Sequence, residues 1–423
     1  MRVMKWSMIA LAVAAGTSQM AVASSQDESK GFLEDSKLNV KTRMLYFSRD
    51  FRNNPSDTQS RREETGLGFV GTYESGFTQG VIGVGADAIG MLGLKLDSGK
   101  GRAGTGLFPT GSDGRSQDDY SKAGGAVKFR ISDTVLKVGD QFTALPVFAT
   151  DDSRLLPEIA QGSLITSNEI KGLTLHAGHF TSLTAQEETN RDSFHLKKAD
   201  VAGGTYAITD TLSTSVYYSK VEDFWRKWYG NINWALPIND EQGLVFDFNI
   251  YDTKSDGAGN VRTFDGETKL DNTAFSLSGA YNIGAHTFTL AYQAVSGDGD
   301  YAYGIDGGGT IFLANSVARS DFNQEDEKSW QARYDLNFAS YGVPGLTFMT
   351  RYVRGDDANV AGTTDGKEWE RDVDIKYVLQ EGAAKDLSFR VRQATYRSGD
   401  GVYYGSPSID ELRLIVEYPL SIL

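Results

Sequence analysis

Apolar and polar residues alternate along most of this chain with a period of two. In segment 372–380, Val373, Ile375, Tyr377 and Leu379 share one face, and the other face carries Asp372, Asp374, Lys376 and Gln380. Segments 385–392 and 412–420 follow the same pattern. Since successive side chains of a strand point to opposite faces, the pattern predicts β-strands. A soluble sandwich that buries the apolar face is one interpretation of any single strand, and a strand that turns this face to lipid is the other.

The connections between the predicted strands alternate between short and long. Tight turns such as 132–133 and 209–210 are followed by loops such as 97–119 and 297–327. Short turns at one rim, long loops at the other and an even strand number are typical of outer-membrane barrels. We therefore predict an all-β fold, a transmembrane antiparallel β-barrel of about 18 strands whose first and last strands pair. A barrel of this size leaves a water-filled lumen.

The first residues predict a secretory signal peptide over residues 1–23. Arg2 and Lys5 precede an apolar run at 8–15, and Ala21-Val-Ala23 supplies the small residues of a cleavage site. We expect residues 24–423 to form a single barrel domain that is exported to the outer membrane of a Gram-negative envelope. The expected surroundings of this domain are outer-membrane lipid and small water-soluble molecules.

Composition narrows the function. The chain has 42 Lys and Arg against 56 Asp and Glu, a formal net charge of -14, which argues against nucleic acid as a partner. It has no cysteine and four histidines. His176 and His179 are three apart on a predicted strand, so they point to opposite faces and cannot share a metal. We expect no catalytic residues, no metal and no cofactor.

Basic residues near both ends of the chain share the phase that faces the lumen. They are Arg43, Arg49, Arg62, Lys376, Arg390, Arg392 and Arg413. Pairing of the first and last strands would gather them on one wall. Each alone fits a structural ion pair with a lumen carboxylate. For the cluster we favour a substrate pathway, because close cations repel unless an anion visits them, and arginine grips carboxylates bidentately.

The segment 142–162 is unusually apolar for a loop. It opens with Ala144-Leu-Pro-Val-Phe-Ala149, continues through Asp151, Asp152, Ser153 and Arg154, and returns to Leu155-Leu-Pro157. Solvent-facing loops do not usually contain so many apolar residues. We therefore predict that this third loop folds into the barrel and narrows it. The alternative is an apolar patch that packs loops together outside the barrel.

Several stretches carry a resemblance to a known family, among them Tyr46-Phe-Ser-Arg-Asp50, Thr72-Tyr-Glu-Ser-Gly-Phe-Thr-Gln-Gly80 and Lys328-Ser-Trp-Gln-Ala-Arg-Tyr-Asp-Leu336. They are similar to the OprD family of substrate-specific outer-membrane porins, in particular its OccD branch, over nearly the whole chain. The resemblance implies an 18-stranded barrel that acts as a monomer, with a weak trimer as the alternative. It also implies passive diffusion of carboxylate-bearing solutes, especially basic amino acids and small peptides, along a basic ladder.

The resemblance assigns roles to individual residues. Ladder positions match Arg49, Arg62, Lys376, Arg390, Arg392 and Arg413, and Arg154 matches an arginine of the constricting loop. An acidic pocket opposite the ladder matches Ser316 and Asp321 in the seventh loop. Arg319 stands where relatives carry a tyrosine, so the preference for basic amino acids stays open. The fourth loop is also short.

Two other classes of function remain as alternatives. Serine-peptidase-type activity has been attached to this family, but Thr310 stands where relatives carry a loop serine, and the chain has no Gly-x-Ser-x-Gly motif. A non-conducting anchor or adhesin would need a plugged lumen, and the sequence offers no plug domain.

Overall fold

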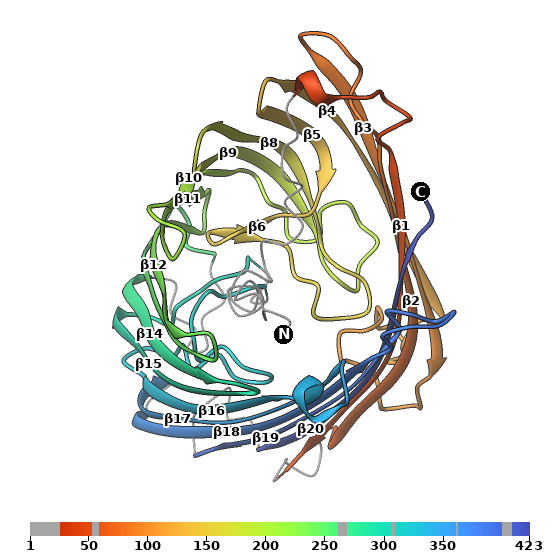
Figure 1. Cartoon of the computed structure of the whole chain (residues 1–423). Helices are drawn as coiled ribbons and strands as arrows, with labels where there is room; N and C mark the ends of the chain where they lie inside the picture. Colours follow the sequence, from red (N-terminus) through yellow and green to blue (C-terminus); the bar gives the residue numbers. More distant parts are fainter. Residues whose placement is uncertain (1–25, 53–58, 261–268, 306–308, 361–362, 400–407) are drawn as a thin grey trace.

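The computed structural model describes residues 26–52, 59–260, 269–305, 309–360, 363–399 and 408–423, where the chain forms a barrel (Figure 1). The predicted signal peptide lies outside these residues. The barrel strands are β1 (Lys37–Phe51), β2 (Arg61–Glu74), β3 (Gly83–Asp97), β4 (Asp119–Ile131), β5 (Thr134–Gln141), β8 (Ile159–Ile170), β9 (Leu173–Thr184), β10 (Ala199–Ala207), β11 (Leu212–Val221), β12 (Trp225–Asn239), β13 (Gln242–Ser255), β14 (Asp271–Ile283), β15 (His286–Asp298), β16 (Lys328–Asn337), β17 (Leu346–Val360), β18 (Thr363–Val378), β19 (Ser388–Ser398) and β20 (Ile409–Ser421).

These strands form one 18-stranded antiparallel sheet, which confirms the predicted fold class. Each strand pairs with the next along the chain, and β20 pairs with β1 from Asn39 opposite Ser421 to Phe51 opposite Ile409. The sheet therefore closes and leaves no edge strand open to lipid. Two short 3-10 helices, η3 (Gln26–Glu28) and η4 (Phe338–Tyr341), lie outside the wall.

None of the helices in the described part of the chain is long and apolar enough to cross a membrane.

The predicted phase of the strands is confirmed on β18. Ile375 and Tyr377 are 42% and 36% exposed on the outer face, whereas Asp372 and Asp374 are 1% and 6% exposed. Apolar side chains thus coat the outside, and charged ones face the interior. This is the reverse of a soluble core, and it fits a wall between lipid and water.

The alternating pattern also predicts strands over residues 78–96 and 193–208, and the start of each was wrong. The strand expected from Thr78 begins at Gly83, because the side-chain amide of Gln26 donates to the carbonyls of Thr78 at 2.8 Å and Gly80 at 3.0 Å. Gly80 has a φ of 112°, which turns the backbone away from the sheet. The strand expected from Ser193 begins at Ala199, so more of the fourth loop stands free of the wall.

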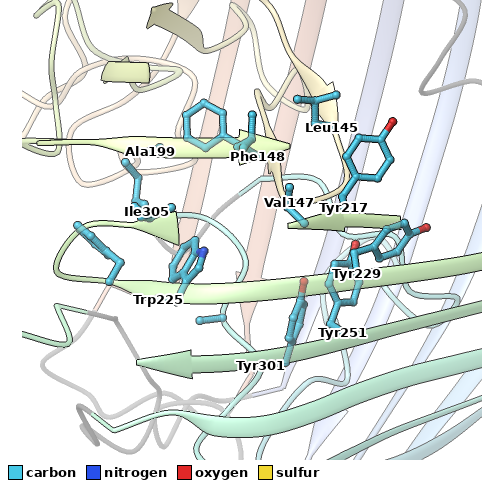
Figure 2. Close-up of a cluster of buried hydrophobic side chains, with 14 of the residues drawn as sticks. Leu145, Val147, Phe148, Ala199, Tyr217, Trp225, Tyr229, Tyr251, Tyr301 and Ile305 are labelled. Carbon is cyan, nitrogen blue, oxygen red and sulfur yellow. The ribbon is translucent and has the colours of Figure 1, made fainter. Parts of the chain in front are cut away.

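The third loop, residues 142–158 and here called L3, folds into the barrel as predicted. Its short strands β6 (Ala144–Leu145) and β7 (Phe148–Ala149) form a hairpin that crosses the interior (Figure 1). Leu145, Val147 and Phe148 pack into a buried cluster with Tyr217 and other aromatic side chains of the wall (Figure 2). Each such burial stabilises the loop by about 1.5–3 kcal/mol.

The other half of L3 reaches a different part of the wall. Leu155 and Leu156 are fully buried in a second cluster that includes Leu45 and Phe47 of β1. Packing at both ends holds the loop across the lumen. The seventh loop, residues 299–327 and here called L7, also contributes Tyr301 to the first cluster, so two loops narrow the channel.

Candidate functional site

The seven predicted ladder residues lie on five consecutive strands, β18, β19, β20, β1 and β2. The register places Lys376 opposite Arg390, and Arg392 opposite Arg413. Across the barrel closure, Phe47 lies opposite Arg413, and on the next pair Arg49 lies opposite Arg62. Strand pairing therefore gathers basic residues from both ends of the sequence on one wall.

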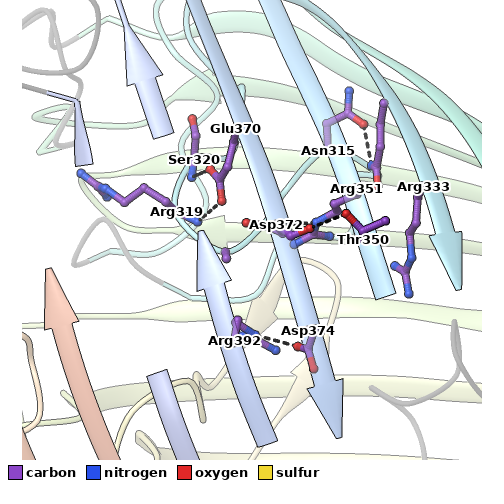
Figure 3. A network of polar contacts seen from close by, with 12 residues as sticks. Asn315, Arg319, Ser320, Arg333, Thr350, Arg351, Glu370, Asp372, Asp374 and Arg392 are labelled. Carbon is purple, nitrogen blue, oxygen red and sulfur yellow. Dashed lines mark hydrogen bonds and ion pairs between the residues drawn. The ribbon is translucent and has the colours of Figure 1, made fainter. Parts of the chain in front are cut away.

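Two carboxylates, Asp374 and Glu411, are interleaved with these cations at the centre of the wall, and each accepts hydrogen bonds from two arginines. Asp374 accepts a hydrogen bond from Arg390 at 2.8 Å. It accepts another from Arg392 at 3.0 Å (Figure 3). Glu411 accepts from Arg49 at 2.8 Å and Arg413 at 2.6 Å. The wall is thus a row of ion pairs as well as a positive surface. A guanidinium has five N–H donors, so pairing with one carboxylate leaves donors for a solute.

The remaining ladder residues differ in their partners. Arg43 pairs with Glu417 at 2.7 Å. Arg62 donates to the carbonyl of Gly104 at 3.0 Å and lies over the ring of Phe51. Lys376 forms no ion pair with a carboxylate in the part of the chain that the structure describes.

The ring of Phe47 lies under three arginine side chains at the centre of the site. The guanidinium carbons of Arg413, Arg49 and Arg154 lie 4.3, 4.7 and 5.3 Å from its ring centroid. The ring itself is fully buried. Cation–π contacts of this kind orient guanidinium planes, so Phe47 joins the L3 arginine to those of β1 and β20.

An acid of L3 ties the constriction to β1. Asp152 forms ion pairs with Lys41 at 2.5 Å and Arg43 at 2.9 Å, and Arg43 also donates to the carbonyl of Arg154. Burial alone would raise the pKa of Asp152, but the charges of Arg43 and Lys41 outweigh it and lower that pKa. The neighbouring Asp151 accepts from the Ser153 amide at 2.8 Å, which shapes the turn.

Ser316 and Asp321, which are predicted to belong to an acidic pocket, lie in contact within L7. The carboxylate of Asp321 accepts hydrogen bonds from Ser316 at 2.7 Å and from Tyr303 at 2.5 Å. Burial raises the pKa of Asp321, against the effects of these two hydroxyls and of the Arg319 charge. Asp321 is therefore a carboxylate whose charge depends on its loop neighbours.

L7 docks on the strands of the ladder. Glu370 of β18 accepts hydrogen bonds from the backbone amides of Arg319 and Ser320, both at 2.8 Å (Figure 3). Arg413 donates to the carbonyl of Ala318 at 3.0 Å. The pocket thus adjoins the basic wall through the loop backbone. In Figure 3 the Arg319 side chain extends away from Glu370.

Sequence reasoning missed two lumen-facing arginines and one hydroxyl. Arg333 of β16 and Arg351 of β17 are direct cross-strand partners and lie beside the ladder. Arg351 pairs with Asp372 at 2.7 Å. Their position in the alternating pattern would have placed them in the lumen. Tyr303, which holds Asp321, lies in a loop whose sequence gives no such signal.

The comparison with protein families decides what kind of molecule this is. The model for outer-membrane porins of the OprD family matches residues 30–422. The chain belongs to the OprD family. Its members are substrate-specific channels of the Gram-negative outer membrane, so the enzyme and anchor alternatives are set aside.

One relative compared by sequence and two solved structures illustrate the breadth of this OprD-family match. Porin D of Pseudomonas aeruginosa is 50% identical over 457 residues, covering 100% of both chains. The crystal structure of Pseudomonas aeruginosa OprD has a TM-score of 0.79 at 46% identity, covering 95% of this chain and 100% of that one. The structure of Pseudomonas aeruginosa OpdK with vanillate has a TM-score of 0.80 at 32% identity, covering 92% and 100%.

Proposed function

We propose that this OprD-family channel carries small solutes bearing a carboxylate, among them amino acids and small peptides, by passive diffusion. The observation that carries the proposal is that basic side chains of β18, β19, β20, β1 and β2 lie on one wall, across the closure of the barrel. OpdK, the relative solved with vanillate, provides a parallel, because vanillate is a carboxylate.

The ladder lowers the cost of moving a carboxylate through a narrow passage. The donors that Arg390, Arg392 and Arg413 do not use on Asp374 and Glu411 replace part of the solute's hydration. In a wet pore each contact contributes only about 1 kcal/mol. Several weak contacts in series let the solute advance from one cation to the next and leave again. A single tight site would retain it.

The proposal extends to Asp321 of L7, whose carboxylate attracts a cationic end on the solute. This supports zwitterionic and basic amino acids as solutes. Arg319 opposes the attraction, since its charge acts on Asp321. We therefore propose that basic amino acids pass but that Arg319 weakens their preference. We also propose that a single chain forms the complete channel, because L3, L7 and all ladder strands belong to one barrel.

The test uses the purified mature chain in planar lipid bilayers, with glutamate, arginine or a neutral sugar added to one side. The variant replaces Arg390 and Arg392 by Gln and Asp374 by Asn, so that no buried carboxylate is left without a partner. We expect flux of the amino acids to fall roughly thirtyfold, because two contacts of about 1 kcal/mol each are lost. Sugar flux should stay nearly constant.

The matched control replaces the outward-facing Arg226 and Lys254 by Gln, which changes two cations outside the lumen. An equal loss of sugar and amino-acid flux in the ladder variant would overturn the proposal. So would a wild-type channel of large conductance that no amino acid blocks.

A further inference from the structure

The wall across the barrel from the ladder has a different chemistry. Strands β10 to β13 lie opposite β1 and β2 (Figure 1). On the periplasmic side of the aromatic cluster, where the short turns lie, their lumen-facing side chains are hydroxyls and amides. These include Thr205, Ser215, Asn231, Asn233 and Asn249. A single carboxylate, Asp247 of β13, lies among them.

Asp247 is held by three amides. Its Oδ1 accepts hydrogen bonds from Nδ2 of Asn231 and of Asn233, both at 3.0 Å. Its Oδ2 accepts from Asn249. Tyr229 donates to Asn249 Oδ1 at 2.7 Å and fixes that amide in turn. The network gives the carboxylate one orientation while the side chain stays half-buried at the lumen face.

All of these partners are neutral. Among the described residues, no lysine, arginine or histidine lies within ion-pair distance of Asp247. The ladder acids Asp374, Glu411 and Glu417 each pair with an arginine. Neutral hydrogen bonds orient a charge but do not cancel it. Asp247 therefore presents its negative charge to the lumen. Three of its roughly four lone-pair positions accept from the amides, and one is left to accept from a solute.

We propose that Asp247, oriented by Asn231, Asn233 and Asn249, binds the ammonium or guanidinium end of a solute that has passed the constriction. The inference rests on the proposed function, in which the carboxylate end of the solute follows the ladder. The two ends then face two walls. Cations on β18 to β2 attract one end, and Asp247 on β13 attracts the other. A solute with both charges is favoured over one with a single charge.

The position of Asp247 along β13 determines when a solute that crosses the channel reaches it. Lumen-facing positions of β13 run from the periplasmic turn through Asp247 and Asn249 to Tyr251, which packs under L3 and L7. Asp321 belongs to L7 itself. A cationic end released by Asp321 therefore meets Asp247 next on its way to the periplasm.

The experiment compares Asp247→Asn with the wild type in bilayers. In a KCl gradient, we expect the reversal potential of the variant to shift towards anion selectivity. We also expect the concentration of arginine needed for half-maximal current block to rise severalfold, with glutamate block unchanged or stronger. The control is Asp252→Asn on the same strand, because Asp252 is exposed on the outer face. A purely structural role for the Asp247 network would alter thermal unfolding and neither of these readouts.

A second variant, Asn233→Asp, adds a carboxylate at the same place and should strengthen arginine block even if Asp247→Asn folds poorly. Unchanged arginine block and reversal potential in a folded variant, with a wild type that arginine does block, would overturn the Asp247 site alone. A wild type blocked by neither arginine nor glutamate would overturn the proposed function itself.

Discussion

Lys227 of β12 donates a hydrogen bond to the backbone carbonyl of Ala302 in L7 at 2.5 Å. Its ammonium lies 4.4 Å from the ring centroid of Trp225, 4.7 Å from that of Tyr301 and 5.9 Å from that of Tyr251. Desolvated cation–π contacts are stronger than exposed ones. One lysine thus fastens L7 to the wall next to Tyr303, which holds Asp321.

Replacing Lys227 by Met should loosen L7 without unfolding the barrel. Methionine fills a similar volume, and exchange of a buried cation for an apolar side chain is often nearly neutral for stability. The tie to Ala302 is lost, so we expect a noisier open channel and higher conductance, with the free energy of unfolding changed by no more than about 2 kcal/mol. Single-channel recording and thermal unfolding check this. The control is Arg226→Met on the outer face, and an unchanged current trace would count against the role of Lys227.

The change Asp152→Asn should release L3 from β1. Lys41 and Arg43 lose their shared carboxylate, whose side chain is 45% exposed. Exposed pairs contribute up to about 1 kcal/mol each, so the population with L3 detached should rise roughly tenfold. Conductance to small ions should increase. Asp151→Asn, a neighbour without these ion pairs, is the comparison, and an equal increase in both variants would contradict a specific role for Asp152.

Acid pH should act on the two loop carboxylates in different ranges. Burial raises the pKa of Asp321. As pH is lowered, this carboxylate therefore takes up its proton before pH reaches the usual value of about 3.9. Asp152 has a lowered pKa, so its contribution to stability is present above about 3.9 and is lost only as pH falls through its lower folded value. We expect arginine block to weaken at a higher pH than the pH at which conductance changes. Measuring both quantities while pH is lowered checks this. Asp321→Asn should abolish that first step.

Arg319→Tyr should strengthen binding of basic amino acids. The substitution removes the cation whose charge opposes attraction to Asp321. A gain of about 1 kcal/mol corresponds to roughly fivefold tighter arginine block. Arg319→Gln separates the loss of charge from the gain of a ring. Equal arginine block in wild type and both variants would show that Arg319 does not act on the solute.

The alternation of apolar and polar residues was enough to predict the barrel, its closure and the side of the wall on which the ladder arginines lie. It succeeded because a strand has only two faces, and a lipid-exposed wall demands the same rule everywhere. Ile375 and Asp374 illustrate this, since they are neighbours in sequence and lie on opposite faces. The inward fold of L3 was predictable from its apolar residues alone.

The partners of the arginines were not predictable at the same level. Whether Arg413 pairs with Glu411 or with a loop carbonyl depends on side-chain angles, and it does both. The three aromatic rings around Lys227 come from β12, β13 and L7. Strand periodicity does not predict where L7 lies. Loop paths are set by tertiary packing, so the contacts around Asp321 could not be predicted from the alternating pattern.

The ion pair between Arg43 and Glu417 joins residues 374 positions apart in the chain. Contacts of such high sequence separation form late, because loop-closure entropy must be overcome first. The edge of β1 therefore stays unpaired until the thirteen-residue β20 is in place. Before then Arg49 lacks Glu411, and Arg413 does not lie over Phe47, so the centre of the ladder is incomplete. A chain that loses this strand loses its solute pathway as well as its closure.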